Sequence, residues 1–182
     1  MLMKRIWISA GHQVNTGANG YIKEGEQAIY LRDKITAYIK EKAPNLEVAN
    51  DSDKDTLQQT IQGMRTFKPD VSIDVHFNSF TKESATGSEI YVPCDATADV
   101  RELAGKIVAS TAEILGINNR GVKIESNSQH NRLGMLHGVQ GGKLMLIEVC
   151  FVTNKNDSDR YMTNRDILAE KIADVILAQF MQ

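Results

Sequence analysis

The stretch that decides the fold of this chain is Ser72-Ile73-Asp74-Val75-His76-Phe77-Asn78-Ser79. With Val71 before it, its first half is rich in β-branched residues, which suit a strand buried in a sheet. His76 and Asn78 follow at the point where such a strand should end. In open α/β sheets, ligands bind in the crevice outside the carboxyl ends of the strands. His76 is therefore a candidate site residue because of its position alone.

Two other apolar runs end in the same way. The run Ile6–Ala10 is followed by Gly11 and His12, and the run Leu144–Ile147 is followed directly by Glu148. Parallel strands in one sheet bring their carboxyl ends to the same edge. We therefore expect His12, His76 and Glu148 to lie together at one edge of a sheet.

The rest of the chain alternates between strand-like and helix-like segments. Strands are expected over residues 4–10, 46–49, 71–75, 88–92 and 144–150. Helices are expected over residues 24–42, 54–67, 97–115 and 167–180, and residues 51–53 should contain the N-terminal cap of the second. We also expect a turn at 118–122, an irregular rim at 126–132 and a helical turn that begins at 157 or 159. This alternation predicts a single α/β domain over residues 1–182, with a three-layer architecture. Its twisted sheet is mixed but mostly parallel, and helices flank both faces.

Composition and charge exclude several functional classes. The chain has 182 residues, enough for one buried core, and its net charge of −2 gives no sign of a nucleic-acid partner. Cys94 and Cys150 each lie in or beside an apolar run, which predicts buried thiols rather than a disulfide. The apolar run after Lys4 and Arg5 is too short for a cleaved signal or a membrane span. We expect a cytoplasmic protein with no membrane span.

The residues at the expected sheet edge could form a catalytic zinc site. Two histidines plus a carboxylate are a common catalytic zinc set, in which the fourth position is left for water. His12 and His76 supply the nitrogens, and Glu24 or Glu26 could supply the oxygen. Each residue has a simpler explanation, because a histidine after a strand is more often structural and acids in a first helical turn favour the helix dipole.

Glu148 is harder to explain as a purely structural residue. It stands between two apolar segments of one expected strand, Leu144–Ile147 and Val149–Val152. Burying an unpaired carboxylate there would be costly, so the side chain is either paired or functional. A carboxylate at that edge could act on a metal-bound water as a general base.

Six blocks of the chain, in this order, resemble the zinc-dependent N-acetylmuramoyl-L-alanine amidases of bacterial autolysins and phage endolysins, the Amidase_3 type. The blocks are Ile8–His12, Asn15–Gly20, Ser72–Ser79, Gly87–Tyr91, Arg120–Lys123 and Ile147–Asn154. The resemblance covers nearly the whole chain. It implies that His12 and His76 bind one catalytic zinc ion and that Glu148 is the catalytic acid/base.

The third zinc ligand requires a choice between two glutamates. In the family this glutamate opens a helix and is followed by apolar residues three and five positions later. From Glu26 those positions hold Ile29 and Leu31, whereas from Glu24 they hold Gln27 and Ile29. We therefore predict Glu26 as the ligand and keep Glu24 as the alternative.

Several positions depart from the family pattern. Gln13-Val14 replaces a glycine-rich step, Asn15 an acidic residue, Thr60 an arginine and Cys150 a glycine. None of these positions is a predicted ligand or the base, so they leave loop shape and substrate preference open.

Three further residues are considered for accessory roles. Asn78 is a candidate for contacting the substrate. The family motifs assign no role to His130 or His137. A place on the rim for His130 and a structural role for His137 are the simpler interpretations, and His137 is the better accessory candidate because it precedes the Glu148 strand.

The resemblance implies zinc-dependent hydrolysis of the amide bond between N-acetylmuramic acid and L-alanine in peptidoglycan. We expect a monomer that has no separate wall-binding module and acts on the wall after lysin-like release. Two alternatives remain open. One is a zinc peptidase or carboxypeptidase acting on stem peptides, and the other is a non-catalytic wall-binding domain whose histidines and glutamates are merely satisfied polar residues.

Overall fold

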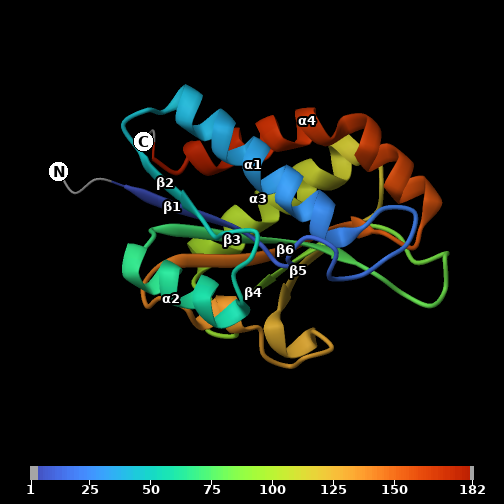
Figure 1. Cartoon of the computed structure of the whole chain (residues 1–182), viewed down its shortest axis with the longest axis horizontal. Coiled ribbons are helices and arrows are strands. Elements are labelled where there is room, and N and C mark those ends of the chain that lie inside the picture. The colour runs from blue at the N-terminus through green and yellow to red at the C-terminus, as the bar shows by residue number, and fades with distance from the viewer. Residues whose placement is uncertain (1–3, 181–182) are drawn as a thin grey trace.

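A computed structural model describes residues 4–180 and contains one mixed sheet of six strands (Figure 1). The strands are β1 (Arg5–Ala10), β2 (Glu47–Asn50), β3 (Val71–Asn78), β4 (Ser88–Val92), β5 (Asn119–Ile124) and β6 (Lys143–Phe151). They are arranged in the order β2-β1-β3-β6-β4-β5. Neighbouring strands run parallel except for β4, which is antiparallel to β6. The expected α/β fold with a mostly parallel sheet is confirmed.

Helices cover both faces of this sheet, which confirms the three layers (Figure 1). The longer helices are α1 (Glu24–Lys42), α2 (Leu57–Phe67), α3 (Ala98–Leu115) and α4 (Lys155–Leu177), and two 3₁₀ turns are η1 (Glu125–Asn127) and η2 (Gly134–His137). The helices α1, α3 and α4 pack on one face, whereas α2 and η2 cover part of the other. None of the described helices is both long and apolar enough to cross a bilayer.

The alternation of side chains along β3 explains why the site lies on the face with less helical cover. Successive side chains of a strand point to opposite faces. Val71, Val75 and Phe77 belong to the core under α1, α3 and α4. Asp74 and His76 therefore face the side of α2. The same alternation in β6 places Met145, Ile147 and Val149 in the larger core and leaves Glu148 on the face of His76.

The structure differs from the expected elements in two places where polar residues hide a regular segment. Residues 119–124 form the edge strand β5 rather than a turn, and its side chains are exposed or only partly buried. The helix α4 is continuous from Lys155, and the Asn154 side chain caps it by accepting a hydrogen bond from the Asp157 backbone. Neither segment has the long apolar run that predicts an element from sequence.

Two smaller expectations are also corrected. The cap of α2 is Thr56, which forms a reciprocal capping box with Gln59, so residues 51–53 do not cap it. Asp51 instead accepts hydrogen bonds from the Ala10 backbone and from Arg32. Both cysteines are free thiols, as predicted, but Cys94 is exposed and Cys150 alone is buried.

Candidate active site

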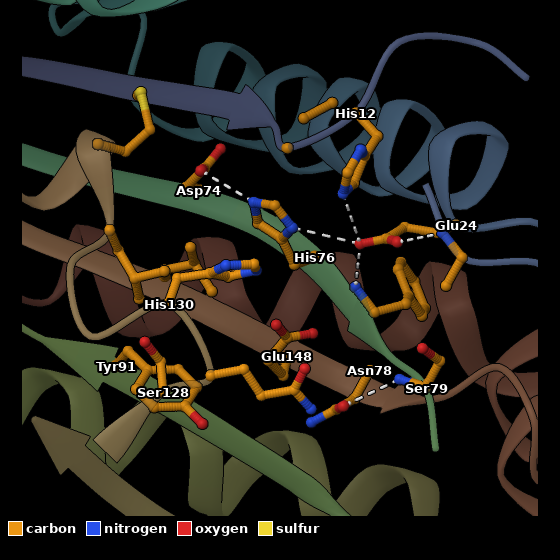
Figure 2. Close-up of a pocket in the computed structure, with 18 of the residues that line it drawn as sticks. His12, Glu24, Asp74, His76, Asn78, Ser79, Tyr91, Ser128, His130 and Glu148 are labelled. Carbon is orange, nitrogen blue, oxygen red and sulfur yellow. Dashed lines mark hydrogen bonds and ion pairs between the residues drawn. The ribbon is translucent and has the colours of Figure 1, made fainter. Parts of the chain in front are cut away.

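The three predicted strand-end residues lie in one cleft of about 840 Å³ (Figure 2). His12 follows β1, His76 lies near the end of β3, and Glu148 is the residue of β6 that pairs with His76 in the sheet register. The cleft is formed where these strand ends meet the loop before α2 and the rim segment of residues 127–135. The prediction that these side chains lie together is therefore confirmed by the geometry.

His12, Glu24 and His76 form a compact set of ligand-type atoms, all within 4.8 Å of one another. Glu24 Oε1 lies 3.4 Å from His12 Nε2 and 3.2 Å from His76 Nδ1 (Figure 2). Ligands held tetrahedrally at about 2.0–2.1 Å from zinc stand roughly 3.3 Å apart. The spacing and the donor types of these three residues therefore fit a zinc ion with one open coordination position.

Glu24 is positioned by its own hydrogen bonds. It is 3% exposed, and its Oε1 accepts from the Phe77 backbone at 3.0 Å while its Oε2 accepts from the Ala18 backbone at 2.7 Å. Burial raises the pKa of Glu24, but hydrogen bonding to His76 and the neighbouring charges outweigh burial and hold the pKa below its ordinary value. Glu24 is thus a preformed carboxylate that connects the loop after β1 with the end of β3.

The structure does not place Glu26, the predicted ligand, with the two histidines. Glu26 is exposed, and its carboxylate forms an ion pair with Lys23 at 2.9 Å. Two residues along an α-helix correspond to a rotation of about 200°, so Glu24 and Glu26 point to opposite sides of α1. Glu24, kept as the alternative, is the residue that lies with the histidines.

Asp74 orients His76 and was not recognised from the sequence. Its Oδ2 lies 3.1 Å from His76 Nε2 (Figure 2). Its Oδ1 accepts a hydrogen bond from the buried Ser9 hydroxyl at 2.6 Å. A carboxylate on one ring nitrogen fixes the tautomer that leaves the other nitrogen free to bind metal. In this protein the free nitrogen is Nδ1, which faces Glu24. The sequence feature that could have identified Asp74 is its spacing, because it lies two residues before His76 and therefore on the same face of the strand.

The two histidines have opposite electrostatic environments. Burial lowers the pKa of His12, so its imidazole is biased towards the neutral form that binds metals. Burial also acts to lower the pKa of His76. The charge and hydrogen bond of Asp74, together with smaller effects of Glu24 and Glu148, outweigh burial and raise this pKa well above its ordinary value. A group of carboxylates around one imidazole favours a bound cation.

Glu148 is the acid in this cleft that has no structural partner. Its Oε2 is buried and has no hydrogen-bond partner among the described residues. Burial raises the pKa of Glu148 to about 8; His76 opposes this shift, whereas Glu24, Glu89 and Asp74 add to it. An unsatisfied acid with a perturbed pKa is typical of a functional group. A nearby cation would lower the pKa of Glu148 again.

The second polar cluster in the cleft was also missed by sequence reasoning. Glu89 on β4 is 2% exposed and pairs with Glu148 in the sheet register. Its carboxylate accepts hydrogen bonds from Asn78, Tyr91, Arg120 and Lys123. Burial acts to raise the pKa of Glu89, but the hydrogen bonds from Arg120, Lys123 and Tyr91 outweigh burial and hold the pKa below its ordinary value. Asn78, a predicted accessory residue, lines the cleft and is held in this cluster.

The remaining histidines differ in their relation to the cleft. His130 is one of the residues lining the rim, as the simpler interpretation had it (Figure 2). His137 is not among the described residues that line the cleft; its Nε2 lies 2.8 Å from Glu125 Oε2. Glu125 also accepts a hydrogen bond from the Leu133 backbone. His137 therefore helps to anchor the rim segment and does not reach the candidate metal ligands.

Fold and site together describe an α/β enzyme whose polar residues converge at the carboxyl ends of the central strands. The chain belongs to the N-acetylmuramoyl-L-alanine amidase family Amidase_3, whose sequence profile matches residues 6–178. Family membership makes it an amidase that acts on peptidoglycan. A search of curated proteins gave no significant match.

Solved structures of amidases share this fold at low sequence identity. An N-acetylmuramoyl-L-alanine amidase from Clostridium difficile 630 is 21% identical, with 98% of this chain and 97% of that chain covered and a TM-score of 0.84. The catalytic domain of the amidase CwlV from Bacillus (Paenibacillus) polymyxa var. colistinus is 23% identical, with 98% of each chain covered and a TM-score of 0.82. The amidase AmiC2 of Nostoc punctiforme is 20% identical, also with 98% of each chain covered, with a TM-score of 0.81.

Proposed function

We propose that this chain is a zinc-dependent hydrolase of the amide bond between the lactyl group of N-acetylmuramic acid and L-alanine in peptidoglycan. One observation carries the zinc dependence: two histidines and Glu24 place their ligand-type atoms within 4.8 Å of one another. The unpartnered Glu148 in the same cleft supports a hydrolytic role. We also propose that the chain acts as a single catalytic domain; a monomeric state and lysin-like release stay predictions.

His12, Glu24 and His76 are the residues that would hold the metal. Zinc bound there would polarise the scissile carbonyl as a Lewis acid and lower the pKa of a coordinated water to about 7. Glu24 contributes negative charge and is held in place by two backbone N–H groups. Asp74 holds Nε2 of His76, so that Nδ1 is directed to the ligand set.

Glu148 is suited to carry the proton during hydrolysis. It is the cross-strand neighbour of His76, and adjacent strands lie about 4.8 Å apart. Its free Oε2 can accept a proton from the attacking water as the C–O bond forms, and can return that proton to the leaving nitrogen as the C–N bond breaks. A positioned acid/base of this kind contributes about 10²–10⁴ in rate.

Digestion of purified peptidoglycan tests the proposed bond. We expect new N-terminal L-alanine and no new reducing sugar ends. A zinc peptidase would expose a different amino acid, and a wall-binding domain would release nothing.

Removal of the metal tests the proposed zinc dependence. Exhaustive chelation should abolish the formation of new N-terminal L-alanine, and added zinc should restore it. Formation of new N-terminal L-alanine that persists after exhaustive chelation would contradict zinc dependence while leaving the amidase assignment in place.

A further inference from the structure

We propose that Arg120 and Lys123 form a carboxylate-binding subsite for the residue that follows L-alanine in the stem peptide. This inference rests on the proposed amidase function and deepens it to a substrate preference. The subsite would bind a peptide whose second residue has a free α-carboxylate more tightly than one in which that group is amidated.

The first support is the arrangement of the two cations around Glu89. Arg120 Nε donates to Glu89 Oε2 at 2.5 Å, and Lys123 Nζ contacts the same oxygen. The other oxygen, Oε1, accepts from Asn78 at 3.0 Å and from Tyr91 at 2.9 Å. Glu89 is therefore saturated with donors, and its role is to hold the cations in place.

The second support is that both cations line the cleft and keep donors that no described residue engages. Arg120 and Lys123 line the cleft, with side chains 33% and 29% exposed. Arg120 Nη1 makes one long contact of 3.5 Å to the Thr86 carbonyl, and Nη2 has no hydrogen-bond partner within the described part of the chain. The guanidinium also lies over the Phe151 ring, at 5.1 Å from its centroid. A guanidinium held in this way can still donate two hydrogen bonds to a carboxylate.

The third support is the sign of the charge at this end of the cleft. Arg120, Lys123 and the buried Glu89 together carry a net charge of +1, Glu148 on the neighbouring strand not being counted. Within the described residues that line the cleft, Arg120 and Lys123 are the only lysine or arginine side chains. Asp51 and Asp55 line the cleft as well, on the segment before α2. A peptide with a free carboxylate is therefore attracted to the Arg120 end, because opposite charges favour binding in a partly desolvated cleft.

The dimensions match the substrate. Glu148 on β6 and Glu89 on β4 are register partners in neighbouring strands, which lie about 4.8 Å apart. Arg120 and Lys123 come from β5, one strand further, and reach back to Glu89. Two extended residues span roughly 7 Å. A scissile bond beside Glu148 therefore allows the α-carboxylate of the second peptide residue to reach the two cations.

A competition assay tests this subsite directly. Two soluble disaccharide-peptides are mixed in equal amounts, one with γ-linked D-glutamate after L-alanine and the other with the α-amide, isoglutamine. The ratio of initial product yields gives the ratio of kcat/KM. Because both substrates meet the same enzyme molecules, this ratio does not depend on the fraction that is correctly folded.

We expect the wild-type protein to prefer the carboxylate substrate by roughly tenfold, since hydrogen bonds between charged groups are about twice as strong as neutral ones. Arg120→Gln keeps a donor for Glu89 but loses the charge, so the preference should fall to about twofold. Lys123→Met should also reduce it. The matched control is Lys106→Gln, because Lys106 is exposed on α3 and pairs with Glu102 outside the cleft.

Equal use of both substrates by the wild-type protein would overturn the subsite, and so would a preference that survives in Arg120→Gln. In either case the proposed amidase function would stand, because the peptide with N-terminal L-alanine is still released. Cleavage of neither substrate would overturn the proposed function and this inference with it.

Discussion

Replacing Glu24 by glutamine should remove most of the zinc affinity of this chain. The substitution preserves size but removes the charge from an oxygen that lies 3.4 Å from His12 Nε2 and 3.2 Å from His76 Nδ1. Structural zinc sites with four ligands bind with about 10–16 kcal/mol, or roughly 3 kcal/mol per ligand. Loss of one ligand should therefore weaken binding by about 10²-fold.

The same substitution should also lower the stability of the metal-free protein. Both carboxylate oxygens of Glu24 accept hydrogen bonds from backbone N–H groups, a buried one from Phe77 and a partly buried one from Ala18. An amide must turn its NH₂ group towards one of them, which costs about 1–3 kcal/mol. Urea unfolding in the presence of a chelator measures this loss separately from metal affinity.

Glu26→Gln is the matched control, because the same chemical change is made two residues further along α1. Glu26 is exposed and pairs with Lys23, and an exposed ion pair contributes about 0–1 kcal/mol. The zinc affinity of the Glu26→Gln variant, measured by competition with a chromogenic chelator at neutral pH, should equal that of the wild type. If Glu26→Gln lost zinc while Glu24→Gln retained it, the geometry of the proposed ligand set would be refuted.

Three further substitutions probe the surroundings of the site. Asp74→Asn should weaken zinc binding by about 10–100-fold, because the amide no longer fixes the tautomer of His76; an unchanged zinc titration and unchanged imidazole ¹⁵N shifts would contradict this. Gly11→Ala should also weaken zinc binding, because the added Cβ would lie 1.9 Å from His76 Nε2 and would displace the ring. Circular dichroism should show that this variant keeps the fold, and a zinc affinity equal to that of the wild type would refute the close approach. Glu89→Gln should lower the free energy of unfolding at neutral pH by about 3 kcal/mol, because two cations lose their buried partner. The folded-state pKa of Glu89 is depressed, so its contribution is present above the unfolded pKa and is lost as pH falls through the folded one. The gap between variant and wild type in urea unfolding should thus close in acid, and a gap that stays constant with pH would contradict the assignment.

Hydrophobic patterning predicted most of the fold and the convergence of His12, His76 and Glu148. It worked because β1, β3 and β6 are buried central strands with apolar runs, and because parallel strands bring their carboxyl ends together. The edge strand β5 has a polar sequence and partners supplied by β4, so local pattern could not reveal it. The first half of α4 was obscured for a similar reason, since many of its residues are exposed.

The sequence did not reveal that Glu24 rather than Glu26 lies with the histidines, because the start of α1 carries no capping signal. Lys23 precedes the helix without a side-chain cap, so the register had to be judged from apolar spacing alone. The inward face of α1 is instead set by contacts of Glu24 with Ala18 and Phe77, which lie outside the helix. Likewise, Glu89 and Arg120 are 31 residues apart, and their pairing depends on the alignment of β4 with β5.

The most direct test of the central claim is to measure bound zinc and the formation of new N-terminal L-alanine together for Glu148→Gln, with His76→Ala as the metal-loss control. Glutamine keeps the shape of Glu148 but cannot accept the proton of the attacking water. We predict that Glu148→Gln retains zinc like the wild type and loses about 10²–10⁴ in turnover, whereas His76→Ala loses zinc and activity together. A fully active Glu148→Gln would contradict the assignment of Glu148 as the base, and a zinc-free Glu148→Gln would show that it is a ligand.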